Sequence, residues 1–256
     1  MIMDNTNQTN DIIIMDFSRI YEKEDFFDHE KIKWIDCTDI IGTNCYCDEE
    51  AERNIKERII NYSPNALHFI DSGNYHYVTE FWMEKIQTDF ALVVFDHHSD
   101  MQKPIFEDIL SCGSWILKAI EKNEYLKKII LVGLSREQEA LISSKYINKI
   151  QCINSESLKE SNYFNKMLNH LGDLPIYISI DKDVLSKNVV ETTWDQGDMT
   201  LGDLKEILHF LINNHQIIGI DICGECRNDI TKISAISKDN NINANLLEFL
   251  KEEKPL

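Results

Sequence analysis

The chain has 256 residues, of which 43% are hydrophobic, and 44 acidic against 26 basic side chains give it a formal charge of −18. This length and apolar content suffice for a buried core, and no Pro/Gly/Ser-rich linker divides the sequence, so we expect one large domain. The negative field argues against nucleic acid or an anionic membrane as a partner and favours a cationic ligand.

The seven cysteines, an odd number, have no spacing typical of a disulfide scaffold. We expect neither a secretory signal nor a membrane-spanning segment, and a reducing cytoplasm is the compartment that fits best. Cys223-Gly-Glu-Cys226 could indicate zinc or redox chemistry. No second pair stands at zinc-ribbon spacing, so a structural zinc is not favoured.

Apolar runs alternate with segments of helical periodicity after a polar start at residues 1–10, which we expect to be frayed or disordered. The predicted strands are Ile12–Phe17, Lys31–Asp36, Ala66–Ile70, Ala91–Phe95, Ile129–Gly133, Ile150–Ile153, Ile176–Ile180 and Gln216–Ile220. The predicted helices are Asp48–Ile60, Tyr77–Ile86, Ser114–Lys122, Glu137–Tyr146, Leu158–Leu171, Thr200–Leu211 and Asn241–Glu252. This alternation predicts an α/β fold with three layers, α/β/α, around a mostly parallel sheet of roughly eight strands.

Metal-ligating side chains follow several of these strands. The strand that begins at Ala91 ends in Asp96-His-His-Ser-Asp100, and on an extended backbone Asp96, His98 and Asp100 project to one face. A later strand ends in Asp181-Lys-Asp183, which repeats the alternation. Ligands of parallel sheets bind beyond the carboxyl ends of the strands, so we expect these side chains to share a site.

His76, after the third predicted strand, completes a set of four carboxylates and two imidazoles. Four carboxylates in one pocket repel each other unless cations neutralise them, and two divalent metal ions would balance the set. Oxygen and imidazole ligands without a thiolate favour Mn²⁺, with iron or cobalt as alternatives. Two such ions can lower the pKa of a shared water and present it as hydroxide to an electrophilic carbon.

These motifs resemble those of the ureohydrolases, the arginase and agmatinase superfamily. Its members carry Asp-x-His-x-Asp, Ser-Phe-Asp-x-Asp and Gly-Gly-Asp-His segments, and the counterparts here are Asp96–Asp100, Ser179–Asp183 and, more loosely, Ser72–His76. Gln196–Thr200 and Gly219–Glu225 resemble two further segments of the family. The resemblance implies a single arginase-like metallohydrolase domain over residues 1–256.

The resemblance also implies roles for individual residues. Asp96 and Asp181 would bridge two metal ions, His76 and Asp100 would complete one shell, and His98 and Asp183 would complete the other. Asp183 and Glu225 would be catalytic carboxylates, and Glu225 would pair with a guanidinium. The implied reaction is attack by a metal-bridging hydroxide that splits a guanidino group into urea and an amine, a hydrolysis of a carbon–nitrogen bond other than a peptide bond.

Two positions depart from the family pattern. Cys112 stands where arginases have a histidine that moves protons, and a thiol could relay a proton in its place. His97, where members usually have a small residue, is either an alternative for this task or a packing residue. The loop Met101–Cys112 lacks the Asn and Ser pattern by which arginases hold the α-amino and α-carboxylate groups of arginine. We therefore expect a small cationic guanidino substrate such as agmatine, or an arginine within a peptide, rather than free L-arginine.

Two other functions stay open. One is a non-catalytic arginase-like protein that binds a metal or another ligand, which Cys112 favours. The other is a deacetylase-like amidohydrolase with a single zinc, against which Asp100 speaks. Trimers and hexamers are common among the ureohydrolases, so a homo-oligomer is a further expectation.

Overall fold

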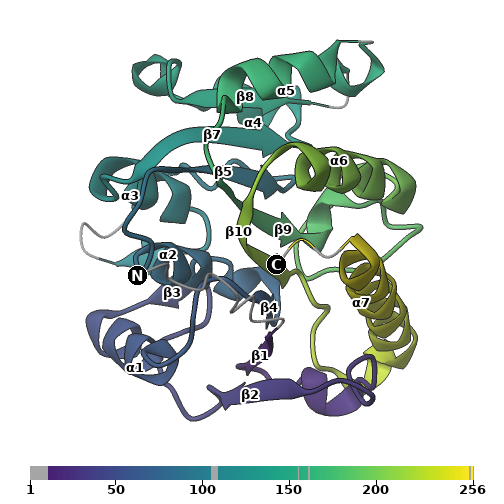
Figure 1. Cartoon of the computed structure of the whole chain (residues 1–256). Helices are drawn as coiled ribbons and strands as arrows, with labels where there is room; N and C mark the ends of the chain where they lie inside the picture. The colour runs from purple at the N-terminus through teal and green to yellow at the C-terminus, as the bar shows by residue number, and fades with distance from the viewer. Residues whose placement is uncertain (1–10, 105–108, 155, 161, 254, 256) are drawn as a thin grey trace, which may run out of the picture.

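Eight parallel strands form the central sheet, in the spatial order β2-β1-β4-β10-β9-β5-β7-β8 (Figure 1). The structure, a computed structural model, describes residues 11–104, 109–154, 156–160, 162–253 and 255. The strands are β1 Ile12–Asp16, β2 Ile32–Asp36, β4 Leu67–Ile70, β5 Phe90–Phe95, β7 Leu126–Val132, β8 Ile150–Ile153, β9 Ile176–Asp181 and β10 Ile217–Cys223. The fraying expected at residues 1–10 lies outside the described residues.

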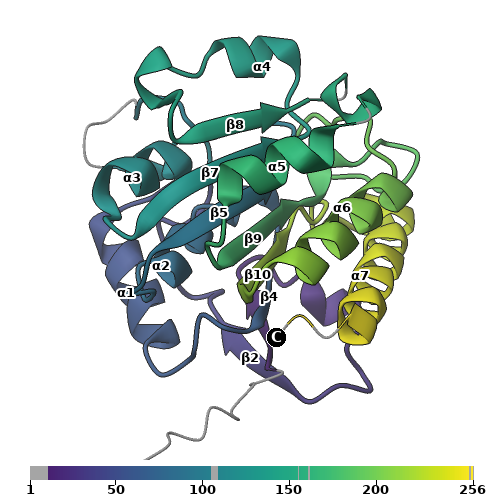
Figure 2. The ribbon, with the colours of Figure 1, turned by 45° about the horizontal axis from the view of Figure 1, so that its top comes forward.

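Helices cover both faces of this sheet (Figure 1, Figure 2). One face carries α1 Glu49–Ile59, α2 Val78–Met83 and α3 Trp115–Lys122, and the other carries α5 Tyr163–Leu171, α6 Leu201–Asn214 and α7 Ile233–Glu253. The short helix α4 Arg136–Ala140 connects β7 to β8. The predicted three-layer α/β/α fold is confirmed.

Alternation along the strands supplies both core layers. In β1, Ile12 and Ile14 pack in the core that includes α6 and α7, while Ile13 and Met15 pack in the core that includes α1, α2 and α3. All six residues of β5 are buried. The strands therefore appear in the sequence as continuous apolar runs, as expected for parallel strands that are covered on both faces.

Several element boundaries differ from the prediction. The helix predicted from Leu158 is divided into a 3₁₀ turn at Ser157–Lys159 and α5, because the side chain of Asn154 accepts hydrogen bonds from the backbone N–H groups of Glu156 and Ser157. β10 continues beyond the predicted end at Ile220, and α7 begins well before the predicted start. The predicted cap at Thr200 is confirmed, since its hydroxyl accepts from the backbone of Asp203 at 3.1 Å.

A two-stranded antiparallel ribbon was not predicted. It pairs β3 Tyr46–Cys47 with β6 Leu110–Ser111. β6 lies inside the segment Met101–Cys112, which was predicted to be a loop. Strands of two residues are too short to show periodicity in a sequence. The ribbon brings residues around 45 and 112 to the edge of the sheet where the expected ligands lie.

Four central strands carry the segments with expected ligands. In the sheet they are consecutive neighbours, in the order β4-β10-β9-β5, so their carboxyl ends form one continuous edge. Among the described helices, none has both the length and the apolar content needed to cross a membrane.

Asp16 ends β1 and is 1% exposed. Burial and the nearby Asp71 carboxylate raise its pKa from 3.8 to about 7. An unfolded chain would lose this proton near its ordinary pKa, so the folded state binds more protons between about pH 4 and pH 7, and stability falls over that range. We expect Asp16→Asn to raise the free energy of unfolding by about 2 kcal/mol at pH 8 and by less at pH 5, as measured by urea denaturation.

A matched control lies at the same level of the neighbouring strand. Asp36 pairs in register with Asp16 but is exposed, and hydrogen bonds from the backbone and side chain of Thr38 lower its pKa. Asp36→Asn is therefore expected to give no gain in stability at pH 8. Equal effects of Asp16→Asn at the two pH values would contradict the burial argument.

Candidate metal centre

Six imidazole and carboxylate side chains meet beyond the carboxyl edge of the four central strands. They are His76, Asp96, His98, Asp100, Asp181 and Asp183, and all six line one cavity of about 230 Å³. The structure thus brings together every residue that the sequence proposed as a metal ligand. Of these side chains, the four carboxylates and His76 are buried, and His98 is half-buried.

Short local hydrogen bonds shape the two acidic loops. Asp96 accepts from the backbone N–H of His98 at 2.5 Å, and Asp181 accepts from the backbone N–H of Asp183 at 2.9 Å. Each first aspartate therefore closes a tight turn through its own side chain, as Asp commonly does. Asp100 has a positive φ of 47°, a conformation that Asp tolerates better than most residues.

The first ligand group surrounds His76. Its Nδ1 atom lies 3.2 Å from Oδ2 of Asp96, 3.2 Å from Oδ2 of Asp100 and 3.6 Å from Oδ2 of Asp181. Ser179 holds the other ring nitrogen at 2.8 Å. The ring is thereby oriented so that Nδ1 faces the carboxylates.

The second ligand group surrounds His98. Its Nδ1 atom lies 2.9 Å from Oδ2 of Asp183 and 3.4 Å from Oδ1 of Asp96. Asp96 therefore directs one oxygen to each histidine, and this is the arrangement needed of a bridging carboxylate. The remaining nitrogen of His98 lies 3.1 Å from Oδ1 of the exposed Asp195, which fixes the ring from the solvent side.

The protonation of the cluster shows how much negative charge it holds. Burial raises the pKa of Asp181 to about 7, and neighbouring carboxylates add to the effect. Burial alone would lower the pKa of His98, but its contacts with Asp183 and Asp96 outweigh this and raise it to about 12. The same balance raises the pKa of His76 well above its ordinary value. Without metal, the positive charges of the two imidazolium rings thus balance part of the carboxylate charge. A hard, oxygen-rich donor set of this kind fits divalent metal ions.

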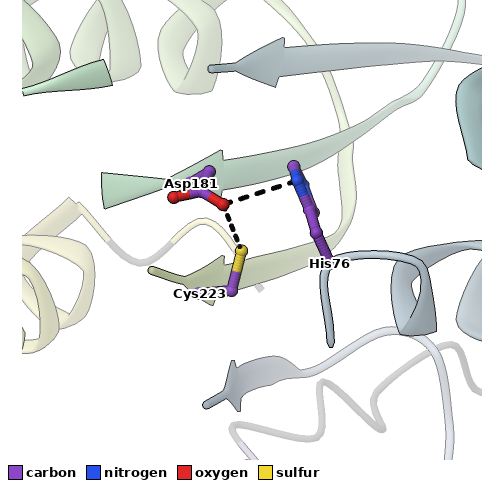
Figure 3. Close-up of side chains that lie close together, drawn as sticks. All are labelled: His76, Asp181 and Cys223. Atoms are coloured by element: carbon purple, nitrogen blue, oxygen red, sulfur yellow. Dashed lines mark hydrogen bonds and ion pairs between the residues drawn. The ribbon is translucent and has the colours of Figure 1, made fainter. Parts of the chain in front are cut away.

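A third group of possible ligands was not predicted from the sequence. Cys223, the last residue of β10, lies with His76 and Asp181 so that their ligand atoms are within 4.8 Å of one another (Figure 3). The expected strand ended at Ile220, which left Cys223 in a loop. Its place beside Asp181 depends on the register of β10 and β9, for which the sequence carries no signal. The structure therefore places a thiol beside the carboxylates and imidazoles of the expected ligand set.

Glu225 does not line the cavity. Its carboxylate is fully buried, lies 2.6 Å from Nζ of Lys182 and accepts from the side-chain amide of Asn243 at 2.9 Å. Gly224 has a φ of 98°, and this left-handed residue turns the chain so that Glu225 faces α7. The implied role of Glu225 as the partner of a guanidinium is not supported by this position.

His97 and Cys112 occupy different positions. His97 is not among the described residues that line the cavity, and its Nε2 atom lies 3.8 Å from Oδ2 of Asp195. Cys112 does line the cavity, together with Cys45, and its backbone N–H donates to the carbonyl of Cys45 at 2.9 Å. Of the two candidates for a proton relay, only Cys112 is therefore placed at the cavity.

The thiols of Cys45 and Cys112 form a hydrogen-bonded pair across the ribbon. This hydrogen bond lowers the pKa of Cys45 to about 7 and, with burial, raises that of Cys112. The sequence-based reasoning did not single out Cys45, because the pairing depends on a ribbon that it did not predict. Near neutral pH, Cys45 is the thiol of this pair that loses its proton.

Comparison with known proteins places this geometry in context. The model of the arginase family matches residues 13–226. An uncharacterized protein of Thermotoga maritima is 37% identical over 186 residues, which are 73% of this chain and 68% of that protein.

Solved structures share the fold at low sequence identity. A formiminoglutamase variant of Trypanosoma cruzi with Mn²⁺ has a TM-score of 0.69 and 11% identity, over 98% of this chain and 96% of that one. Proclavaminate amidino hydrolase of Streptomyces clavuligerus has a TM-score of 0.66 and 14% identity, over 96% and 93%. An arginase of Entamoeba histolytica in complex with L-ornithine has a TM-score of 0.66 and 14% identity, over 94% and 98%.

The thiol pair gives a test of the site's electrostatics. The thiolate is the nucleophile of cysteine, so in metal-free protein we expect Cys45 to be alkylated by iodoacetamide with a midpoint near pH 7. Cys112→Ala removes the hydrogen bond and should move the midpoint toward the ordinary value of about 8.5. Peptide mass spectrometry after timed labelling measures the midpoint for Cys45 in the wild type and in Cys112→Ala.

The neighbouring Cys47 serves as an internal control, because burial raises its pKa to about 12 and it should remain unlabelled. An unchanged midpoint for Cys45 in the Cys112→Ala protein would show that the pair does not interact as described.

Proposed function

This chain belongs to the arginase family, and from that membership and the ligand cluster we propose that it is a binuclear metal-dependent hydrolase that cleaves a guanidino carbon–nitrogen bond to give urea and an amine. The observation that carries the proposal is the position of Asp96, whose two oxygens face two separate ligand groups. Such a carboxylate fits two cations better than one.

The residues that would hold the two ions divide between the two groups. His76 and Asp100 would serve the first ion, His98 and Asp183 the second, and Asp96 both. Asp181 lies beside His76, and the resemblance to the family implies that it also serves the second ion. When bound, two divalent ions, of which Mn²⁺ is the expectation from carboxylate and imidazole ligands, would supply Lewis acidity and a water of lowered pKa.

The partners behind the ligands would keep them in place. Trp115 donates its indole N–H to Oδ2 of Asp100 at 2.6 Å, and the backbone N–H of His97 donates to Oδ1 of Asp183 at 3.0 Å. Gly73 leaves no room for a side chain, since a Cβ there would lie 2.6 Å from Oδ2 of Asp181. These contacts orient the carboxylates from behind and leave their other faces to the cavity.

Aromatic side chains are the best candidates to receive the substrate. Tyr46 and Trp194 line the cavity and are 43% and 40% exposed. The indole N–H of Trp194 donates to Asn74 at 2.8 Å, and Asn74 donates to Asn44 at 2.7 Å, so the ring is held at the rim. Among the described lining residues the acidic ones are the four proposed ligands, so stacking on an aromatic face would take the place of a salt bridge to a guanidinium.

The size and charge of the cavity favour a small cationic group. A volume of about 230 Å³ suits the guanidino head of a substrate. No lysine or arginine is among the described residues that line it, so no cationic side chain there would form a salt bridge with the α-carboxylate of free L-arginine. Agmatine, a similar guanidino compound, or an arginine within a peptide therefore fits better.

One observation favours a second candidate, a non-catalytic metal-binding member of the family. Glu225, the implied guanidinium partner, is bound to Lys182 and does not face the cavity. A deacetylase-like enzyme with one zinc is less well supported, because Asp100 lies 3.2 Å from His76 and extends the ligand set.

Metal loading followed by a urea assay tests the proposal. We expect about two equivalents of bound metal after Mn²⁺ loading, and urea release from agmatine, related guanidino compounds or arginine peptides in preference to L-arginine. Asp181→Asn should reduce the bound metal and lower urea release by about 100-fold or more, because it removes a ligand from both ions.

Asp198→Asn is the matched control, because Asp198 is exposed and does not line the cavity. Asp198→Asn should leave the amount of bound metal and the rate of urea release unchanged. Less than about one equivalent of tightly bound metal would refute the proposal. Two equivalents without hydrolysis of any guanidino compound would favour the non-catalytic candidate.

Trp194 gives a second test, of substrate binding. Trp194→Ala should raise KM about tenfold while kcat and bound metal change little, because a cation–π contact is worth about 1–2 kcal/mol. Trp194→Phe keeps an aromatic face but loses the hydrogen bond to Asn74. Its KM should therefore lie between those of the wild type and Trp194→Ala. A loss of bound metal in Trp194→Ala would mean that the ring supports the ligands instead.

A further inference from the structure

Cys223 lies inside the ligand cluster (Figure 3). Its side chain is 1% exposed, and its Sγ atom lies 3.3 Å from Oδ2 of Asp181. The same oxygen lies 3.6 Å from Nδ1 of His76. The thiol, the carboxylate and the imidazole therefore converge on one point, and they come from β10, β9 and the loop after β4.

A redox role with the other cysteine of the Cys-Gly-Glu-Cys segment does not explain Cys223. Gly224 turns the chain between them, and the two side chains pack in the cores on opposite faces of the sheet. The backbone N–H of Cys226 donates to Asp239, on α7, at 3.1 Å. Cys223 and Cys226 therefore do not form one dithiol unit.

A role in apolar packing also leaves the position unexplained. A buried thiol in an ordinary core is surrounded by apolar groups, whereas Cys223 is directed at a carboxylate that is itself proposed to bridge two ions. The register pairs Cys223 with Asp181 in adjacent parallel strands, so the backbone fixes this contact. A group fixed in this way is available to any cation held by Asp181 and His76.

We propose that Cys223 is a further ligand of the metal centre, binding as a thiolate to the ion held by His76 and Asp181. This rests on the proposed function, since it presupposes that the cluster binds divalent ions. On binding, the S–H bond breaks, a sulfur–metal bond forms, and the proton leaves to solvent with no change of oxidation state. The thiol then no longer donates to Oδ2 of Asp181, and that oxygen becomes free for metal.

A thiolate ligand at Cys223 changes which metal ion the centre is expected to prefer. Carboxylate, carbonyl and water ligands suit Mn²⁺, whereas thiolates favour softer ions such as Zn²⁺, Fe²⁺ and Co²⁺. With Cys223 in the set, the centre selects these softer ions over Mn²⁺, in contrast to the expectation from the carboxylates and imidazoles alone.

Cobalt titration of metal-free protein tests this inference without an activity assay. The wild type should bind about two equivalents of Co²⁺ and show a thiolate-to-cobalt charge-transfer band in the near ultraviolet. Cys223→Ser should still bind Co²⁺ but lose the band, and its preference for Co²⁺ over Mn²⁺ in competition should fall about tenfold or more. Cys226→Ser is the matched control and should keep both the band and the preference, because that thiol lies on the other face of the sheet.

A measurement on a protein with native Cys223 guards against misfolding of the variant. X-ray absorption of the zinc-loaded Cys45→Ser/Cys112→Ser protein should show a sulfur neighbour at about 2.3 Å, and this sulfur can no longer come from the thiol pair on the ribbon.

The outcomes separate this inference from the proposed function. Two bound equivalents without a charge-transfer band or a sulfur neighbour would overturn the role of Cys223 and leave the binuclear proposal standing. A band that survives in Cys223→Ser would likewise overturn it. Less than one equivalent of bound cobalt would overturn both.

Discussion

Four buried carboxylates repel one another in this site, so the site needs positive charge to be stable. The sheet order places β9 between β5 and β10, and the tight turns after β5 and β9 bring Asp96, Asp100, Asp181 and Asp183 into one cavity. Without metal, the proton affinities of His76 and His98 rise to compensate. The backbone thus assembles a concentration of negative charge that folding alone would disfavour, and such an arrangement is typical of a site selected for binding cations.

Much of the fold could be predicted from the sequence, because its physical causes are local or periodic. Strands covered on both faces must be apolar throughout, so runs such as Phe90–Phe95 stand out. Boundaries were less predictable where a side chain competes with the helix, as Asn154 does before α5. The β3–β6 ribbon could not be predicted, since its two-residue strands are defined by pairing between segments far apart in the chain.

The same division applies to the site. The proposed ligands stand after apolar runs, which is a local property of the sequence, and the structure places all six at one cavity. Tight turns after β5 and β9 bring the side chains together, and not the alternation of an extended strand that the sequence suggested. The positions of Cys223, Glu225 and the Cys45–Cys112 pair depend on strand register, on the left-handed turn at Gly224 and on the ribbon. None of these can be read from residue spacing. The resemblance to a family likewise assigned Glu225 by motif, and the turn directs it to another layer.

The ammonium of Lys182 connects two parts of the molecule that the sequence keeps far apart. In the sequence, Lys182 stands between the proposed ligands Asp181 and Asp183. Its side chain points to the opposite face, where it contacts Glu225 and, on α7, Asp239 and Asn243. The match to the arginase family ends at residue 226, before this helix begins. A chimera that exchanged the final helix with that of a relative would remove Asp239 and Asn243 and leave this buried cation with Glu225 as its remaining partner among these contacts. Position 182 and α7 would therefore have to be transplanted as one unit.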